Sequence, residues 1–167
     1  MLSFTFTTLA MEFWTQKGKF YILPMDASIE DENILKESGI DIDELKRLLA
    51  RAKGKKVAFI DACRIKPRWK PAAVVYKPKL INIAFIFSTK EGQISNVDKE
   101  KRYSAFTRAL YEMATSGLFN VDVDDDGYVE IKELMKPLTK WLRRVSADSR
   151  QTPEVWGPDD FEVFPVE

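Results

Sequence analysis

Two continuous apolar runs, at 56–63 and 80–88, are the clearest features of the hydrophobic pattern, and each is bounded by charge or proline. Such runs are typical of strands that are covered on both faces, because a half-exposed strand would alternate apolar and polar residues. A further strand is expected at 2–9, where Phe and Thr alternate, and another at 19–24. A short strand at 161–166 is predicted to end the chain.

Helical periodicity marks three segments between or after these strands. The first begins at Asp41, a favourable capping residue followed by apolar positions at helical spacing. The second lies behind Ser104, and from Phe106 its apolar residues recur with the spacing of one helix face. The third covers 131–145, where Pro137 is expected to kink or restart the helix. This order of elements predicts an α/β fold with a mostly parallel sheet.

The composition excludes several kinds of site, because the 167 residues include one Cys and no His. The chain alone cannot form a Ser-His-Asp triad, a Cys-His pair or a zinc site with several His ligands. The lone Cys63 excludes an internal disulfide and gives no sign of an oxidising compartment. No apolar run approaches the roughly 20 residues of a membrane span, and a signal peptide is not evident. We therefore expect a soluble cytoplasmic protein without a membrane partner.

Zero net charge, from 26 basic and 26 acidic residues, conceals three charged blocks. The segments 26–44 and 122–133 are acidic, and the segment 51–80 between them is basic. Trp69 lies among these cations, a pattern that would suit phosphate contacts and base stacking. Because the rest of the chain is not basic, a solvated loop beside a strand explains the block better, and nucleic acid is not the expected partner.

The sharpest local motif is the twelve-residue segment 122–133, which reads DVDDDGYVEIKE. A calcium loop needs oxygen ligands at positions 1, 3, 5, 7, 9 and 12, with glycine at position 6 and an apolar residue at position 8, and all of these are present. Acidic residues are also favoured before a helix by its dipole, and this alternative stays open. The expected Ca²⁺ ligands are Asp122, Asp124, Asp126, the carbonyl of Tyr128, Glu130 through a water, and Glu133.

The surroundings of this loop differ from a helix-loop-helix unit. The preceding helix is expected to stop at Gly117, short of Asp122, and the sequence contains no second loop to pair with this one. A lone loop of this kind is expected to bind Ca²⁺ with a Kd of about 10⁻⁴ to 10⁻³ M, outside the range of calcium sensors.

Cys63 is the second residue of chemical interest, at the carboxyl end of the apolar run 56–63. Open α/β sheets form their ligand sites at the carboxyl ends of their strands. Buried strands are also where inert structural cysteines occur. The spacing alone is compatible with a ligand site and with an inert structural cysteine, and it favours the inert cysteine.

The run Ile60-Asp61-Ala62-Cys63-Arg64, followed by Pro67, is one of seven segments whose order along the chain is informative. The other six are KFYILPMDA at 19–27, the helix at 40–49, STKEGQ at 88–93, YSAFTRAL at 103–110, DDDG at 124–127 with Glu-Leu at 133–134, and QTPE at 151–154. Together they resemble bacterial caspase-like peptidases of clan C14, the relatives of metacaspases and orthocaspases.

The resemblance implies a caspase-like α/β/α sandwich in which Cys63 stands at the nucleophile position. It also implies that Asp61 lines a pocket for a substrate Arg or Lys, a role that suits a buried carboxylate. The family places its catalytic His in an SGHG turn, whereas the aligned stretch 7–10 reads Thr-Thr-Leu-Ala. Cys63 then lacks a base to form its thiolate, and we expect peptide hydrolysis to be lost.

The family's first two strands should precede this point, so the chain resembles a caspase-like domain that is missing its first strands. We expect one partial domain over 1–167, with 1–64 leading up to the Cys strand, a loop at 65–79 and a half at 80–167 that resembles the small subunit of the family. The sheet edge beside 2–9 would be open, and we therefore predict self-association or a partner that completes the sheet.

The sequence leaves three functional readings. The first is a domain related to C14 cysteine peptidases that is a pseudo-enzyme and keeps an EF-hand-like calcium loop. The second is a calcium-binding module on a caspase-like scaffold. The third is a truncated form of an active cysteine endopeptidase specific for Arg or Lys, or one whose His comes from another chain. In each reading the expected partner is a protein or a peptide.

Overall fold

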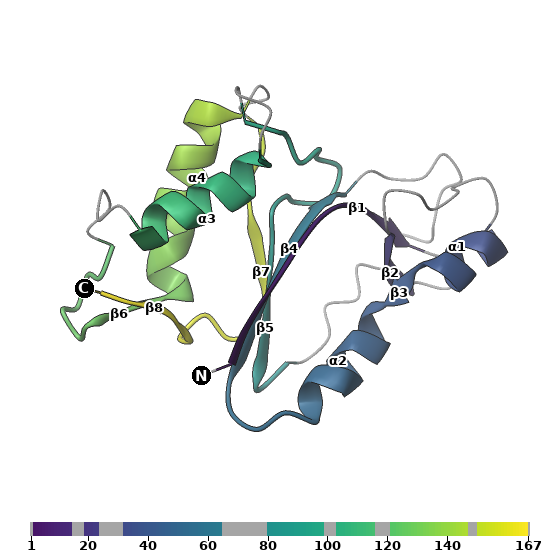
Figure 1. The fold of residues 1–167 in the computed structure, drawn as a ribbon, viewed down its shortest axis with the longest axis horizontal. Helices are drawn as coiled ribbons and strands as arrows, with labels where there is room; N and C mark the ends of the chain where they lie inside the picture. Colours follow the sequence, from purple (N-terminus) through teal and green to yellow (C-terminus); the bar gives the residue numbers. More distant parts are fainter. Residues whose placement is uncertain are drawn as a thin grey trace.

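The computed structural model of the protein describes residues 2–14, 19–23, 32–64, 80–98, 103–115, 121–146 and 150–166 (Figure 1). Its strands are β1 (Leu2–Trp14), β2 (Phe20–Leu23), β3 (Ile40–Asp41), β4 (Lys56–Cys63), β5 (Ile83–Phe87), β6 (Tyr128–Glu130), β7 (Glu154–Trp156) and β8 (Glu162–Pro165). Its helices are α1 (Glu32–Ser38), α2 (Ile42–Ala50), α3 (Ala105–Thr115) and α4 (Ile131–Val145). The loop predicted at 65–79 lies outside the described residues.

Six strands form one sheet in the order β3-β2-β1-β4-β5-β7, and β6 pairs with β8 in a separate two-stranded sheet. The α/β class is confirmed, but the larger sheet is mixed rather than mostly parallel. β4 runs parallel to β1 and β5, whereas the pairs β1–β2, β2–β3 and β5–β7 are antiparallel. The connection from β1 to β2, residues 15–19, is too short for the crossover that a parallel pair requires, so these two strands must be antiparallel.

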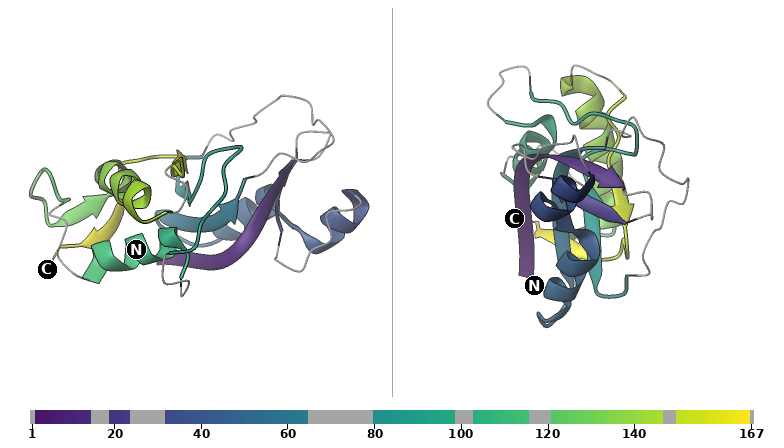
Figure 2. Two further views of the ribbon diagram at one scale, coloured as in Figure 1. Left: turned by 90° about the horizontal axis from the view of Figure 1, so that it is seen from above. Right: turned by 90° about the vertical axis from the view of Figure 1, so that its right-hand side faces the viewer.

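Helices cover both faces of the larger sheet (Figures 1 and 2). Because side chains alternate along a strand, Val57 and Phe59 of β4 belong to one apolar cluster, together with residues of α3 and α4. Ala58 and Ile60 belong to a second cluster on the opposite face, together with Ile42 of α2. The continuous apolar run of β4 therefore serves two cores, as expected for a strand within an α/β/α sandwich.

The helix starts agree with the sequence. The Asp41 carboxylate accepts a hydrogen bond from the Asp43 N–H at 2.8 Å before α2, and the Ser104 hydroxyl accepts one from the Thr107 N–H at 2.9 Å before α3. Pro137 does not restart α4, which continues through it as one element. Burial of the apolar face outweighs the hydrogen bond that proline cannot donate. The buried apolar residues of this helix are Ile131, Leu134, Leu138, Trp141 and Leu142.

The amino-terminal part of β1 forms an open edge within the described part of the chain. Between residues 2 and 6 this strand pairs with β4, and β2 joins its other side only at 11–14. Figure 2 places β1 at the margin of the molecule. The edge expected beside 2–9 is therefore present among the residues that the structure describes. Within those residues, no helix has the length and apolar character needed to cross a membrane.

Candidate functional site

Cys63 ends strand β4, and its side chain is partly exposed. Two of its contacts within the described residues involve the backbone of Ser95. The Ser95 N–H points to Sγ with 3.3 Å between N and S, and Sγ lies 3.7 Å from the Ser95 carbonyl oxygen. Neither backbone group is a base that removes a thiol proton at neutral pH, so these contacts position the side chain without activating it.

The stretch 7–10, where the resemblance places the family's His turn, lies beside the carboxyl end of β4. The pairing of β1 with β4 shifts at this point, because Phe6 pairs with Ile60 and the next pair joins Ala10 to Ala62. Three residues of β1 therefore lie opposite one residue of β4. Irregularities of this kind bend a strand and often occur next to active sites. The stretch 7–10, which has neither His nor Gly, thus runs next to the end of β4 that carries Cys63.

Asp61 is a buried carboxylate, 3% exposed, on the same strand. Its oxygens accept hydrogen bonds from three hydroxyls, which belong to Ser95 at 2.6 Å, Thr107 at 3.0 Å and Ser104. Among the described residues, no Lys or Arg pairs with this carboxylate. The hydroxyls therefore satisfy its oxygens and leave its charge without a cation.

A cavity of about 460 Å³ lies next to this cluster, on α3 and the segment before it. Its wall includes Thr107, whose hydroxyl donates to Asp61. The Thr107 hydroxyl therefore lies between the Asp61 carboxylate and the cavity. Arg108 pairs within this wall with Asp98 at 2.9 Å and with Glu112 at 2.8 Å. The arrangement suits a cationic side chain, because the carboxylate behind the wall can attract it over a short distance.

Arg64 ties the end of β4 to β7, a role that the sequence analysis missed. It is 3% exposed and forms an ion pair with Glu154. Its guanidinium carbon lies 4.8 Å from the ring centre of Phe87 and 5.0 Å from that of Trp156. A planar cation stacks well on aromatic faces, and this packing fixes the chain directly after Cys63. The signal in the sequence was a cation next to an apolar run, but nothing local identified its partner.

The segment 122–133 folds around its acidic side chains. Asp122 accepts a hydrogen bond from the Gly127 N–H at 3.0 Å, and Gly127 has φ of +88°, a left-handed conformation that favours glycine. Carboxylate oxygens of Asp122, Asp124 and Asp126 lie within 4.8 Å of one another, close enough to share one cation. A second group with this property comprises Asp124, Glu130 and Glu133. All five predicted carboxylate ligands thus belong to one of two overlapping clusters.

Two buried carboxylate oxygens in this segment, Asp122 Oδ1 and Glu130 Oε2, accept no hydrogen bond in the described structure. The two residues are only 9% and 8% exposed. Glu130 Oε2 lies 3.8 Å from the Lys132 ammonium, which is an ion-pair distance. Asp122 Oδ1 is therefore the clearer case of a buried charged oxygen without a donor, which is unfavourable unless a cation compensates it. The donor set fits Ca²⁺, which prefers carboxylate and carbonyl oxygens.

Glu133 has a structural role in addition to its place in the cluster. Its two oxygens accept hydrogen bonds from the Val123 N–H at 2.8 Å and the Glu130 N–H at 3.0 Å, and the second bond caps α4. Burial acts to raise the pKa of Glu133, but the bonds with Glu130 and Val123 lower it below the usual value. The pKa of Glu130 is raised by its hydrogen bond with Glu133 and by burial. Glu133 thus belongs both to the capping box of α4 and to a carboxylate cluster.

The strand of this segment pairs with the end of the described chain, because Val129 of β6 pairs with Phe164 of β8. α4 begins within the segment, at Ile131, and the described part of α3 ends at Thr115. Residues 116–120, which include the expected helix stop at Gly117, lie outside the described residues.

Comparison with known families finds a match to the caspase domain of peptidase family C14 over residues 15–160. The matched range contains Asp61, Cys63 and the acidic segment 122–133, and it begins after the stretch 7–10. No curated protein matches the chain. Since the match covers most of the chain and agrees with the α/β architecture, the chain belongs to the caspase-domain family.

Proposed function

We propose that this caspase-domain protein no longer hydrolyses peptides and that it binds Ca²⁺ through the segment 122–133. The observation that carries the first part is the absence of His from the whole sequence, together with the stretch 7–10 beside Cys63, which contains no general base. A cysteine peptidase needs a base to form its thiolate and an acid to protonate the leaving amine. General acid–base catalysis contributes about 10² to 10⁴ in rate, so its loss would leave little turnover.

Fluorogenic peptides with Arg or Lys at the cleavage site, incubated with Ca²⁺, test this part. We expect no turnover above the blank, and the matched control is Cys63→Ala. Turnover that disappears in Cys63→Ala would contradict the proposal, because it would show that the thiol is catalytic.

We further propose that Asp61 still recognises the side chain of Arg or Lys. The support is its buried carboxylate, which lies behind Thr107 at the cavity wall and pairs with no cation in the described part of the chain. Arginine amide is expected to raise the melting temperature of the wild type but not of Asp61→Asn, which keeps the shape and removes the charge. An equal rise in both proteins would exclude this role.

The calcium part rests on the unpartnered Asp122 Oδ1 and on the two overlapping carboxylate clusters. Bound Ca²⁺ would neutralise the clustered charges and would be held by the Asp122, Asp124, Asp126, Glu130 and Glu133 carboxylates with the Tyr128 carbonyl. Titration calorimetry at millimolar Ca²⁺ should give a binding heat that the double variant Asp122→Ala/Glu133→Ala lacks. An unchanged heat in that variant would refute the assignment.

A second function is that of a calcium-binding module in which the caspase-type residues have no role. The acidic clusters favour it, because they lie in the loop before β6, on β6 and at the start of α4, whereas Cys63 ends a strand of the other sheet. The double variant Asp61→Asn/Cys63→Ala separates the two proposals. It should bind Ca²⁺ as the wild type does in both cases, but only a retained peptide-binding site would make it lose the response to arginine amide.

The third proposal is an active Arg/Lys-specific endopeptidase whose base is supplied by another chain. The partly exposed Cys63 thiol supports it, because a group from outside could reach that end of β4. Free imidazole added to the peptidase assay tests this proposal by chemical rescue. Turnover that requires both imidazole and Cys63 would support it, and no rescue would argue against it.

A further inference from the structure

One face of α4 carries four cations, Lys132, Lys136, Lys140 and Arg144, at intervals of one helical turn. Like charges four residues apart destabilise a helix by about 0.2–0.5 kcal/mol per pair. Cations near the amino-terminal end of a helix also oppose its dipole. Of the four, only Arg144 lies in the last turn, where the dipole favours a cation, so helix stability does not explain the row as a whole.

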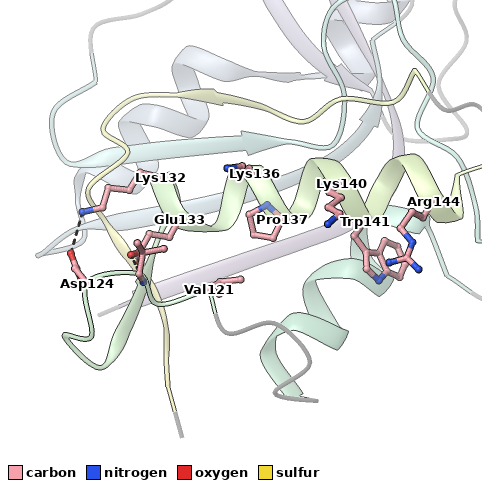
Figure 3. A pocket seen from close by; sticks show the side chains of 10 residues that line it. Val121, Asp124, Lys132, Glu133, Lys136, Pro137, Lys140, Trp141 and Arg144 are labelled. Carbon is pink, nitrogen blue, oxygen red and sulfur yellow. Dashed lines mark hydrogen bonds and ion pairs between the residues drawn. The ribbon is translucent and has the colours of Figure 1, made fainter.

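The four cations line a groove of about 750 Å³, here called the α4 groove (Figure 3). Its apolar lining includes Val121, Pro137 and Trp141, and Trp141 is only 8% exposed. Two acids, Asp124 and Glu133, lie at the end where α4 begins (Figure 3). The α4 groove thus combines an apolar lining with a basic margin.

Most of these cations have no acidic partner among the residues that the structure describes. Lys132 lies 3.6 Å from Asp124 and 3.8 Å from Glu130. In the part of the chain that the structure describes, Lys136, Lys140 and Arg144 form no ion pair. Three cations along the groove are therefore available to an external anion.

We propose that the α4 groove binds an acidic peptide segment of a protein partner. Asp and Glu side chains of that segment would pair with Lys136, Lys140 and Arg144, and an apolar side chain would pack against Pro137. A peptide fits better than a nucleic acid for two reasons. The indole of Trp141 is too buried to stack on a base, and the acids at one end of the groove repel a continuous phosphate chain.

The α4 groove shares Asp124 and Glu133 with the calcium segment, and the following step rests on the proposed calcium binding. Bound Ca²⁺ would neutralise negative charge at that end of the groove and weaken the ion pair between Asp124 and Lys132. The acidic peptide would then bind more tightly, and by linkage it would strengthen Ca²⁺ binding by the same factor.

A short fluorescein-labelled peptide of Asp and Glu around one central Phe is the probe, measured by fluorescence anisotropy at physiological ionic strength. Its counterpart with Asn and Gln tests the need for charge, and an oligo(dT) strand tests nucleic acid. Lys140→Glu should weaken binding of the acidic peptide roughly tenfold, since it replaces an attractive charge within the site by a repulsive one. The matched control is Arg143→Glu, an exposed cation on the same helix turn that does not line the groove, and it should change the affinity much less.

No binding of the acidic peptide, equal weakening by the two variants, or a preference for oligo(dT) would each overturn the proposal. Repeating the titration in EDTA and in Ca²⁺ distinguishes the peptide site from its coupling to Ca²⁺. Binding that is specific for Lys140 but equal in both buffers would leave the peptide site standing and overturn its coupling to Ca²⁺. Calorimetry without peptide then decides whether the calcium site itself has failed.

Discussion

Replacing Asp122 by Asn removes one charge from the first position of the calcium segment and changes its shape very little. The amide oxygen can still accept the hydrogen bond from the Gly127 N–H, which lies 3.0 Å from the Asp122 carboxylate. The change removes the negative charge at Oδ1, the buried oxygen without a donor. Without metal we expect the variant to be at least as stable as the wild type, because a buried, uncompensated charge is lost.

The effect in calcium follows from linkage, because a ligand bound only by the folded state stabilises it. At about 10 mM Ca²⁺ and a Kd of about 10⁻⁴ to 10⁻³ M, the wild type gains about 1.4 to 2.7 kcal/mol. For a chain of this size, each kcal/mol raises Tm by about 2 to 4 °C, so the expected rise is about 3 to 11 °C. Asp122→Asn should lose most of this rise.

Differential scanning calorimetry in CaCl₂, MgCl₂ and EDTA measures this effect. The matched control is Asp125→Asn, which removes the same charge from an exposed position that supplies no predicted ligand. Asp125 has φ of +60°, and Asn tolerates this left-handed conformation well, so the control leaves the backbone unstrained. The reasoning is refuted if Ca²⁺ does not raise the Tm of the wild type, or if both variants lose the rise equally.

Three further outcomes are expected. Gly157→Ala should destabilise the fold by about 1–3 kcal/mol or more, because Gly157 has φ of +113° and a Cβ there would lie 2.5 Å from the Ile83 carbonyl oxygen. Urea unfolding measures this loss, and an unchanged midpoint would contradict it. Cys63 should react with iodoacetamide at pH 7 no faster than a small-molecule thiol, and rapid alkylation would reveal a thiolate. The open edge at 2–9 should cause concentration-dependent association in light scattering that Thr5→Lys reduces, whereas a wild-type monomer at high concentration would exclude it.

The sequence was most informative where the signal is local. The apolar run of β4 predicted a strand covered on both faces, and Asp41 and Ser104 marked the starts of α2 and α3, because apolar burial and capping depend on residues close together in the chain. The row of cations on α4 was also readable from its spacing, but the groove that it borders depends on the packing of Val121 against that helix.

The sequence was least informative where partners are distant. β7 is only three residues long, and its place follows from pairing with β5 and from the ion pair that joins Glu154 to Arg64, 90 residues away. The hydroxyls around Asp61 come from residues 34, 43 and 46 positions further along the chain. No pattern in a single sequence specifies such contacts, since they form only when α3 and the segment before it pack against β4.

The pairing of β6 with β8 joins the acidic segment to residues 159–166, which contain no predicted ligand. Besides the strand pairing, the Val166 N–H donates to the Gly127 carbonyl at 2.9 Å, the Ile131 N–H to Phe161 at 2.9 Å and the Lys132 N–H to Asp159 at 2.8 Å. Segments connected in this way tend to open and close together, so their amide protons exchange with solvent as one cooperative unit. Slower exchange in β8 on addition of Ca²⁺ would therefore report metal binding at a distance, from a strand that never touches the ion.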